Sequence, residues 1–277
     1  YRHLWQDEVE TAERARSIVE TGLPRLVDSS GRVSLNAGGQ ELDAGTLHRL
    51  TPWGQYYAGA AGLAVGKALG ASADACARAP FIVSHALTSS VISYGLGAFV
   101  GLPIGASVAV ATLFSFQTAR VLHNRTARYH AFLDLLTALG MIGLGLLARG
   151  DKRGRILLAA SILLLPQFHP LGGGLMASVL GLAALLFYGE WRAVVVPAAL
   201  SFAGLLVLTH PWLQETWHKG GEHHLRSLTF FEVSYAFIFY LGACLFFFRR
   251  GAKRIAGQLL LLLALAVIFV RLGDLHP

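Results

Sequence analysis

Charged residues are scarce in this sequence. Asp, Glu, Lys and Arg make up 14% of the 277 residues, whereas apolar residues make up 54%. A soluble globule of this size needs more polar surface than this composition supplies, which excludes an ordinary soluble domain. We therefore expect an all-α, polytopic membrane protein. The formal net charge of +7 is interpreted by membrane side, and we expect no nucleic-acid partner.

Cysteine is equally scarce. Cys76 and Cys244 lie before one apolar run and inside another, so we expect no disulfide and no cysteine metal site. A His-rich segment contains His210, His218, Glu222, His223 and His224. Its spacing matches no standard site. A divalent metal ion, contact with an acceptor, and a plain hydrated loop all stay open for this segment, and we assign no residue as a metal ligand.

The chain also lacks a convincing internal repeat. Transporters often carry such repeats, so a membrane transporter or lipid flippase is kept only as the alternative function. No apolar run precedes the first acidic segment, and the sequence begins at Tyr1. We therefore expect a first spanning helix to precede residue 1.

Long apolar runs begin after residue 78. They predict about eight bilayer-spanning helices, at 79–100, 102–119, 130–148, 155–169, 171–188, 192–209, 230–248 and 254–270. Residues 79–277 are thus predicted to form a transmembrane helix bundle. Residues 1–78 are predicted to form an extracytoplasmic first loop that carries juxtamembrane helices.

Basic residues in alternate connectors predict the orientation. Three short loops that fall on one face contain Arg149, Lys152, Arg153 and Arg155, then Arg192, then Arg249, Arg250, Lys253 and Arg254. Positively charged loops stay in the cytoplasm. The N-terminal helix, the 120–129 connector and the turn at 167–174 are therefore expected on the extracytoplasmic side of the cell membrane.

The first helix is predicted from about Trp5 to Glu20 and begins with the acidic pair Asp7-Glu8. One stripe of this helix is mainly apolar and the rest is charged, which predicts an amphipathic helix lying on a membrane. The stripe contains Trp5, Val9, Ala12, Arg16 and Val19, and the rest contains Asp7, Glu8, Glu10, Glu13 and Arg14. Acidic residues in a first helical turn can simply stabilise the helix N-terminus. Alternatively, a carboxylate at the membrane surface can act as a general base, and Asp7 is the candidate.

One basic cluster lies on the predicted outer face, where cations are disfavoured. It comprises Arg120, His123, Arg125, Arg128 and His130. These side chains can extend to lipid phosphates at a helix end. They can also bind the phosphate or diphosphate of a lipid substrate, because guanidinium groups pair with phosphate oxygens.

Several segments occur in a familiar order: Asp7-Glu8, Thr51-Pro52-Trp53-Gly54-Gln55-Tyr56-Tyr57, Ala77-Arg78-Ala79-Pro80-Phe81, Arg125-Thr126-Ala127-Arg128-Tyr129 and Phe168-His169-Pro170-Leu171-Gly172. Together they resemble the GT-C class of membrane glycosyltransferases, in the branch of the protein O-mannosyltransferases and the lipid A aminoarabinose transferase (glycosyltransferase family 39). The resemblance covers most of residues 5–190. It implies a GT-C helix bundle.

The resemblance also implies a reaction and a site. A sugar would pass from a polyprenyl-phosphate donor to a protein, lipid or glycan acceptor, with inversion at the anomeric carbon. It implies that Asp7 is catalytic with Glu8 beside it, and that Arg125 and Arg128 approach the donor phosphate. Some relatives carry an Asp where this chain has His130. Further candidates for substrate binding are His130, Tyr56, Tyr57 and His169, the last of which could instead cap a helix.

Overall fold

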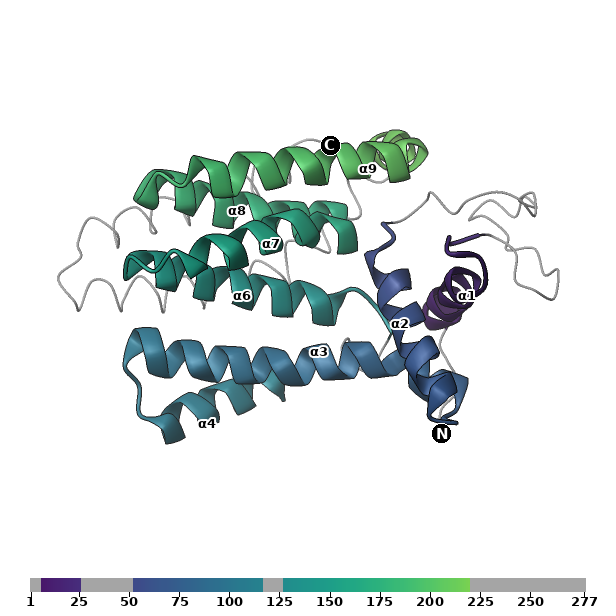
Figure 1. Cartoon of the computed structure of the whole chain (residues 1–277), viewed down its shortest axis with the longest axis horizontal. Coiled ribbons are helices and arrows are strands. Elements are labelled where there is room, and N and C mark those ends of the chain that lie inside the picture. The colour runs from purple at the N-terminus through teal and green to yellow at the C-terminus, as the bar shows by residue number, and fades with distance from the viewer. Residues whose placement is uncertain (1–5, 26–51, 117–126, 220–277) are drawn as a thin grey trace. The chain divides into compact units, whose positions relative to one another are not determined.

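The computed structural model describes residues 6–25, 52–116 and 127–219 (Figure 1). The chain divides into two compact units, Tyr1–His210 and Pro211–Pro277, and the description below concerns the first. The helices are α1 (Gln6–Thr21), α2 (Gly54–Ala68), α3 (Ala73–Gly95) with a π-helical turn η1 (Leu96–Val100), α4 (Ile104–Ser115), α6 (His130–Ala148), α7 (Arg153–Phe168), α8 (Pro170–Tyr188) and α9 (Trp191–Lys219). No strand forms within the described residues, and the all-α prediction is confirmed for them.

The helix bounds agree closely with several of the apolar runs. The run at 130–148 coincides with α6, and the runs at 155–169 and 171–188 differ from α7 and α8 by at most two residues. α3 begins earlier than predicted, because Ser72 has an extended backbone and Asp74 lies in the first turn. The predicted boundary between residues 78 and 79 therefore falls inside this helix. The runs at 230–248 and 254–270 lie outside the described residues.

Among the described residues, two helical segments are long and apolar enough to cross a membrane, Ala73–Val100 and His130–Ala148. Their most apolar windows are only 22% and 33% buried inside the protein. A core helix of a soluble protein would be mostly buried, so these segments instead present apolar side chains outward. Other apolar helices in the described part are shorter, at Ile104–Ser115, Gly172–Tyr188 and Trp191–Val207.

The long helices lie side by side, and α1 and α2 lie across one end of them (Figure 1). We call this the site end; it includes residues 127–130 and 167–170. The opposite end, which we call the basic end, is formed by η1 and by residues 149–155 and 188–192. Contacts between Arg149 and Ala98, and between Arg155 and Glu190, join the elements of the basic end.

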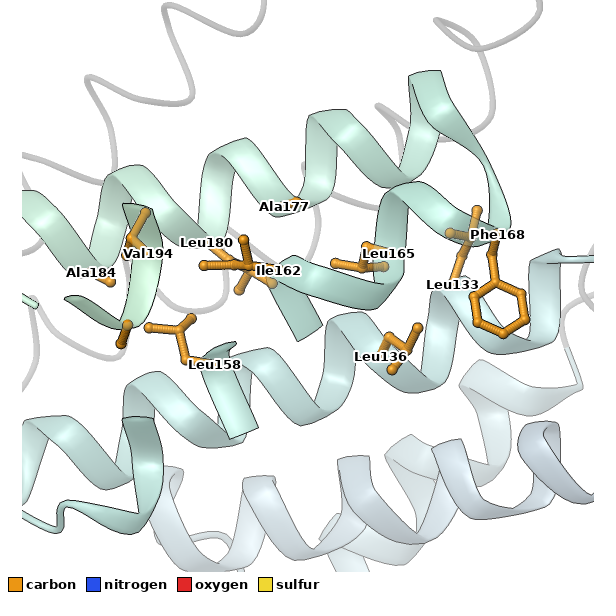
Figure 2. Close-up of a cluster of buried hydrophobic side chains, with 11 residues drawn as sticks. Leu133, Leu136, Leu158, Ile162, Leu165, Phe168, Ala177, Leu180, Ala184 and Val194 are labelled. Carbon is orange, nitrogen blue, oxygen red and sulfur yellow. The ribbon is translucent and has the colours of Figure 1, made fainter. Parts of the chain in front are cut away.

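The main apolar core joins α6, α7, α8 and α9 (Figure 2). Its buried members include Leu133, Leu136, Leu158, Ile162, Leu165, Phe168, Ala177, Leu180, Ala184 and Val194. Glycines allow these helices to approach closely. A Cβ added at Gly143 would lie 2.9 Å from the Gly154 carbonyl oxygen, and one added at Gly173 would overlap the Leu165 backbone. The close packing of α7 with α6 and α8 therefore sets the positions of their site-end residues.

Candidate functional site at the α1–α2 end

The centre of the site end is a buried ion pair between α1 and α3. Arg78 donates from Nε to Glu8 Oε1 at 2.8 Å and from Nη2 to Glu8 Oε2 at 2.7 Å. The side chains are 3% exposed for Glu8 and 21% for Arg78. Two parallel charge-assisted hydrogen bonds fix distance and orientation together. This pair therefore determines how the first turn of α1 sits against α3.

The same carboxylate also holds the connector that leads into α6. The backbone N–H of Ala127 donates to Glu8 Oε1 at 3.0 Å, across 119 residues of sequence. Ala127 is fully buried and packs in a small cluster with Phe81 and Ala131. The chain is therefore anchored one residue before Arg128. The structure thus brings Glu8, one member of the acidic pair, to the end of the basic connector.

The structure does not describe the side chains of two candidate site residues, Asp7 and Arg125. Asp7 lies in the first turn of α1, and its side chain is outside the described part. Arg125 lies in 117–126, which is also outside it, whereas Arg128 is described and half-buried. The roles of Asp7 and of both arginines stay predictions.

A group of aromatic and imidazole rings begins with Tyr129, the residue after Arg128. The Tyr129 ring is 4.2 Å from the His130 ring and 4.4 Å from the His169 ring, centre to centre. Beneath it, Phe132 stacks on Phe168 at 4.6 Å. The structure therefore joins the candidates His130 and His169 through Tyr129, a residue that the sequence analysis did not single out. The sequence offered one indication that Tyr129 belongs to the site, which is its position between Arg128 and His130.

His169 also begins α8. Its Nδ1 accepts the backbone N–H of Gly172 at 2.9 Å, and Pro170 occupies the first helical position. This is N-capping by a side chain, which satisfies a helix N–H that would otherwise have no partner. The capping alternative for His169 is confirmed, and its contact with substrate stays a prediction.

The two tyrosines of α2 pack against α1. Tyr56 is fully buried and donates its hydroxyl hydrogen to Glu10 Oε1 at 2.9 Å. Tyr57 is 42% exposed and donates to the Gly22 carbonyl at 2.9 Å. Both hydroxyl groups thus connect α2 to α1 and to the residue that follows it. The predicted contact of the two tyrosines with substrate stays a prediction.

The side of α1 that packs against the protein is unexpectedly polar. Glu8, Thr11, Arg14 and Ser17 are buried there, whereas Val9 and Val19 of the predicted apolar stripe are exposed. The exposed stripe suits the expected membrane-surface helix. Glu8 and Arg14, which the periodicity places outside the apolar stripe, are both covered by the protein. Sequence periodicity separates the two faces of a helix but does not say which face the protein covers.

Arg14 is the most buried charged residue of α1. Its Nη1 donates to the Arg25 carbonyl at 2.8 Å, while its Nε has no hydrogen-bond partner in the part of the chain that the structure describes. Burial lowers the pKa of the Arg14 guanidinium from its ordinary value, and the negative charge of Glu10 opposes this. Arg14 therefore ties the segment after α1 back onto the helix.

No group of three or more His, Cys, Asp or Glu residues that could hold a metal occurs within the described ranges. The His-rich segment lies largely outside these ranges. His223 and His224 lie outside the described residues, as do the side chains of His210 and His218. A divalent metal at this segment stays a prediction.

No protein-family model, curated protein or solved structure matches this chain. What the site can do is therefore judged from its own groups. The site end combines a fixed carboxylate, guanidinium groups and closely spaced rings at the end of two candidate membrane spans. These groups can hold an anion and orient a ring-shaped ligand.

Proposed function

We propose that this chain is a multi-pass membrane glycosyltransferase of the GT-C type. It transfers a sugar from a polyprenyl-phosphate donor to a protein, lipid or glycan acceptor on the extracytoplasmic face. The observation that carries the proposal is the hydrogen bond from the Ala127 N–H to Glu8, which joins the acidic turn of α1 to the arginine connector. The proposed reaction needs a base on α1 and phosphate-binding arginines on the connector to lie close together, and this hydrogen bond supports that arrangement.

The membrane placement is supported by the outward-facing apolar surfaces of α3 and α6. The basic loop at 149–155 lies at the end opposite α1. By the positive-inside rule, this basic end faces the cytoplasm and the site end faces outward. A polyprenyl chain would then lie in the bilayer with its phosphate at the level of the connector.

In the proposed reaction, Asp7 takes the proton from the acceptor hydroxyl. The acceptor oxygen forms a bond to the anomeric carbon as the bond from that carbon to the phosphate oxygen breaks. Polyprenyl phosphate leaves with the electron pair of the broken bond. Arg125 and Arg128 stabilise the negative charge that grows on the leaving phosphate.

Glu8 is proposed to support this chemistry from beside Asp7. Both of its oxygens already accept hydrogen bonds from Arg78 or Ala127. A carboxylate held in this way is suited to positioning the connector. The neighbouring Asp7 is therefore the better choice for the base.

The test uses Asp7→Asn in proteoliposomes supplied with radiolabelled polyprenyl-phosphate sugars. The variant should lose roughly 10²–10⁴-fold in sugar transfer or release, because general-base catalysis contributes about that much. Glu20→Gln is the matched control, since Glu20 is an exposed acid at the other end of the same helix. Unchanged turnover in the Asp7 variant would remove Asp7 from the mechanism. Movement of the lipid across the bilayer with its sugar–phosphate bond intact would favour the transporter or flippase instead.

A further inference from the structure

The basic end has a surplus of positive charge that the proposed reaction does not use. It carries five basic residues, Arg149, Lys152, Arg153, Arg155 and Arg192, and two acids, Asp151 and Glu190. The difference, five minus two, is a net charge of +3. All five basic side chains belong to exposed residues. An anionic partner would therefore meet accessible cations here.

Both acids of this end are already paired. Arg153 donates to Asp151 at 2.6 Å, and Arg155 donates to Glu190 at 2.7 Å. Arg149, Lys152 and Arg192 have no carboxylate partner among the residues that the structure describes. The surplus charge therefore resides on these three side chains.

Two of the three are held in place by aromatic rings. The Arg149 guanidinium lies 4.7 Å from the centre of the Phe99 ring and donates to the Ala98 carbonyl. The Arg192 guanidinium lies 5.1 Å from the centre of the Trp191 ring. Cation–π contact holds a guanidinium over the ring face and leaves its edge donors accessible to an acceptor.

Aromatic side chains at this end also match the boundary of a bilayer. Tyr94 is 59% exposed and lies in the last turn of α3, and Trp191 is 55% exposed and is the first residue of α9. Exposed tyrosine and tryptophan at helix ends are typical of the headgroup level of a membrane. The three unpaired cations are therefore placed where lipid phosphates lie.

We propose that the basic end binds anionic phospholipid headgroups through Arg149, Lys152 and Arg192. This inference rests on the membrane placement in the proposed function, but not on sugar transfer. Each basic residue near an anionic leaflet should strengthen binding by about fivefold. The partner is thus a lipid with a net negative headgroup, such as phosphatidylglycerol, and not a zwitterionic one.

The test uses Trp191 as a local probe. The full chain is reconstituted in vesicles of phosphatidylcholine mixed with phosphatidylglycerol in equal parts, with bromine atoms on the acyl chains of one lipid or the other. The Trp191 signal is the difference between the parent and Trp191→Phe. Brominated phosphatidylglycerol should quench this signal more strongly than brominated phosphatidylcholine. Equal quenching by the two lipids would overturn the inference.

Variants connect the preference to the three side chains. The triple variant Arg149→Gln, Lys152→Gln, Arg192→Gln should lose it, and Lys152→Gln alone should reduce it by a few fold. Arg16→Gln with Lys67→Gln, which removes exposed cations from α1 and α2, should leave it unchanged. If the triple variant does not fold, Lys152→Gln carries the test, and an unchanged preference in that variant would remove Lys152 from the site.

Two further arms distinguish the possible outcomes. Inorganic phosphate should not abolish the lipid preference, and if it does, the site binds free phosphate and the lipid inference is wrong. Asp7→Asn should lose sugar transfer but keep the phosphatidylglycerol preference. In the parent protein, a phosphatidylglycerol preference without sugar transfer would overturn the glycosyltransferase proposal alone, and sugar transfer without the preference would overturn the lipid inference alone.

Discussion

The site end and the basic end each contain an ion pair between an arginine and a carboxylate, but the two pairs differ in burial. At the site end, Glu8 and Arg78 are 70 residues apart in sequence, and the Glu8 side chain is 3% exposed. At the basic end, Asp151 and Arg153 are two residues apart, and the Arg153 side chain is 82% exposed. A buried pair becomes costly when one partner is removed, whereas an exposed pair contributes little. The comparison indicates that the site end is held in one geometry and that the basic end stays accessible.

Breaking the buried pair should have the largest effect. Arg78→Met leaves the Glu8 carboxylate buried without its guanidinium partner, which should cost about 3–5 kcal/mol of unfolding free energy. Denaturant unfolding in detergent measures this change. The double variant Glu8→Gln, Arg78→Met should lose less than the sum of the single losses, because the two residues interact directly. Additive losses would contradict a direct pair.

Adding one methyl group should distinguish the packing of the two ends. Gly173→Ala places a Cβ against the Leu165 backbone at the site end and should cost about 1–3 kcal/mol. Gly105 lies in α4 near the basic end, and a Cβ added there would meet nothing within 4 Å. Gly105→Ala should therefore be neutral or stabilising by up to about 1 kcal/mol. Thermal unfolding of both variants checks the contrast, and equal destabilisation would contradict it.

Removing one hydroxyl group compares a partly buried with an exposed hydrogen bond between α1 and α2. Tyr56→Phe removes a partly buried hydrogen bond to Glu10 and should cost about 0.5–1.5 kcal/mol. Tyr57→Phe should cost less, because its hydroxyl bond to Gly22 is exposed. Sugar transfer measured in the same variants tests the predicted substrate role. A loss of transfer without a loss of stability would favour substrate contact over packing.

The smallest effect is expected at the exposed Asp151–Arg153 pair. Hydrogen bonds from Arg153 lower the pKa of the Asp151 carboxyl below its ordinary value. A carboxyl with a lowered folded-state pKa contributes stability above its unfolded pKa of about 3.9 and loses that contribution as the pH falls through the folded value. Asp151→Asn should therefore slightly flatten the acid side of the stability curve. Stability measured from neutral pH to below pH 3 checks this, and a steeper acid decline in the variant would contradict the sign.

Local patterns accounted for much of the fold, and distant contacts accounted for the rest. Both bounds of α6 were predicted correctly, because its apolar run lies between two polar or charged residues, His130 and Arg149. The contact of Glu8 with Arg78 and Ala127 was not predicted, because nothing within either segment indicates a partner so far along the chain. The burial of Arg14 was missed for a related reason, since it depends on α2 and on the turn at Arg25.

The hydrogen bond that begins α8 restricts the chemistry open to His169. Because Nδ1 accepts the Gly172 N–H, that nitrogen carries no hydrogen, and the neutral ring must carry its hydrogen on Nε2. In this tautomer the imidazole can donate to an oxygen of a ligand. It could remove a proton from a ligand only by giving up the capping hydrogen bond from Gly172. The proton acceptor of the proposed reaction must therefore come from another group, which agrees with the choice of a carboxylate of α1.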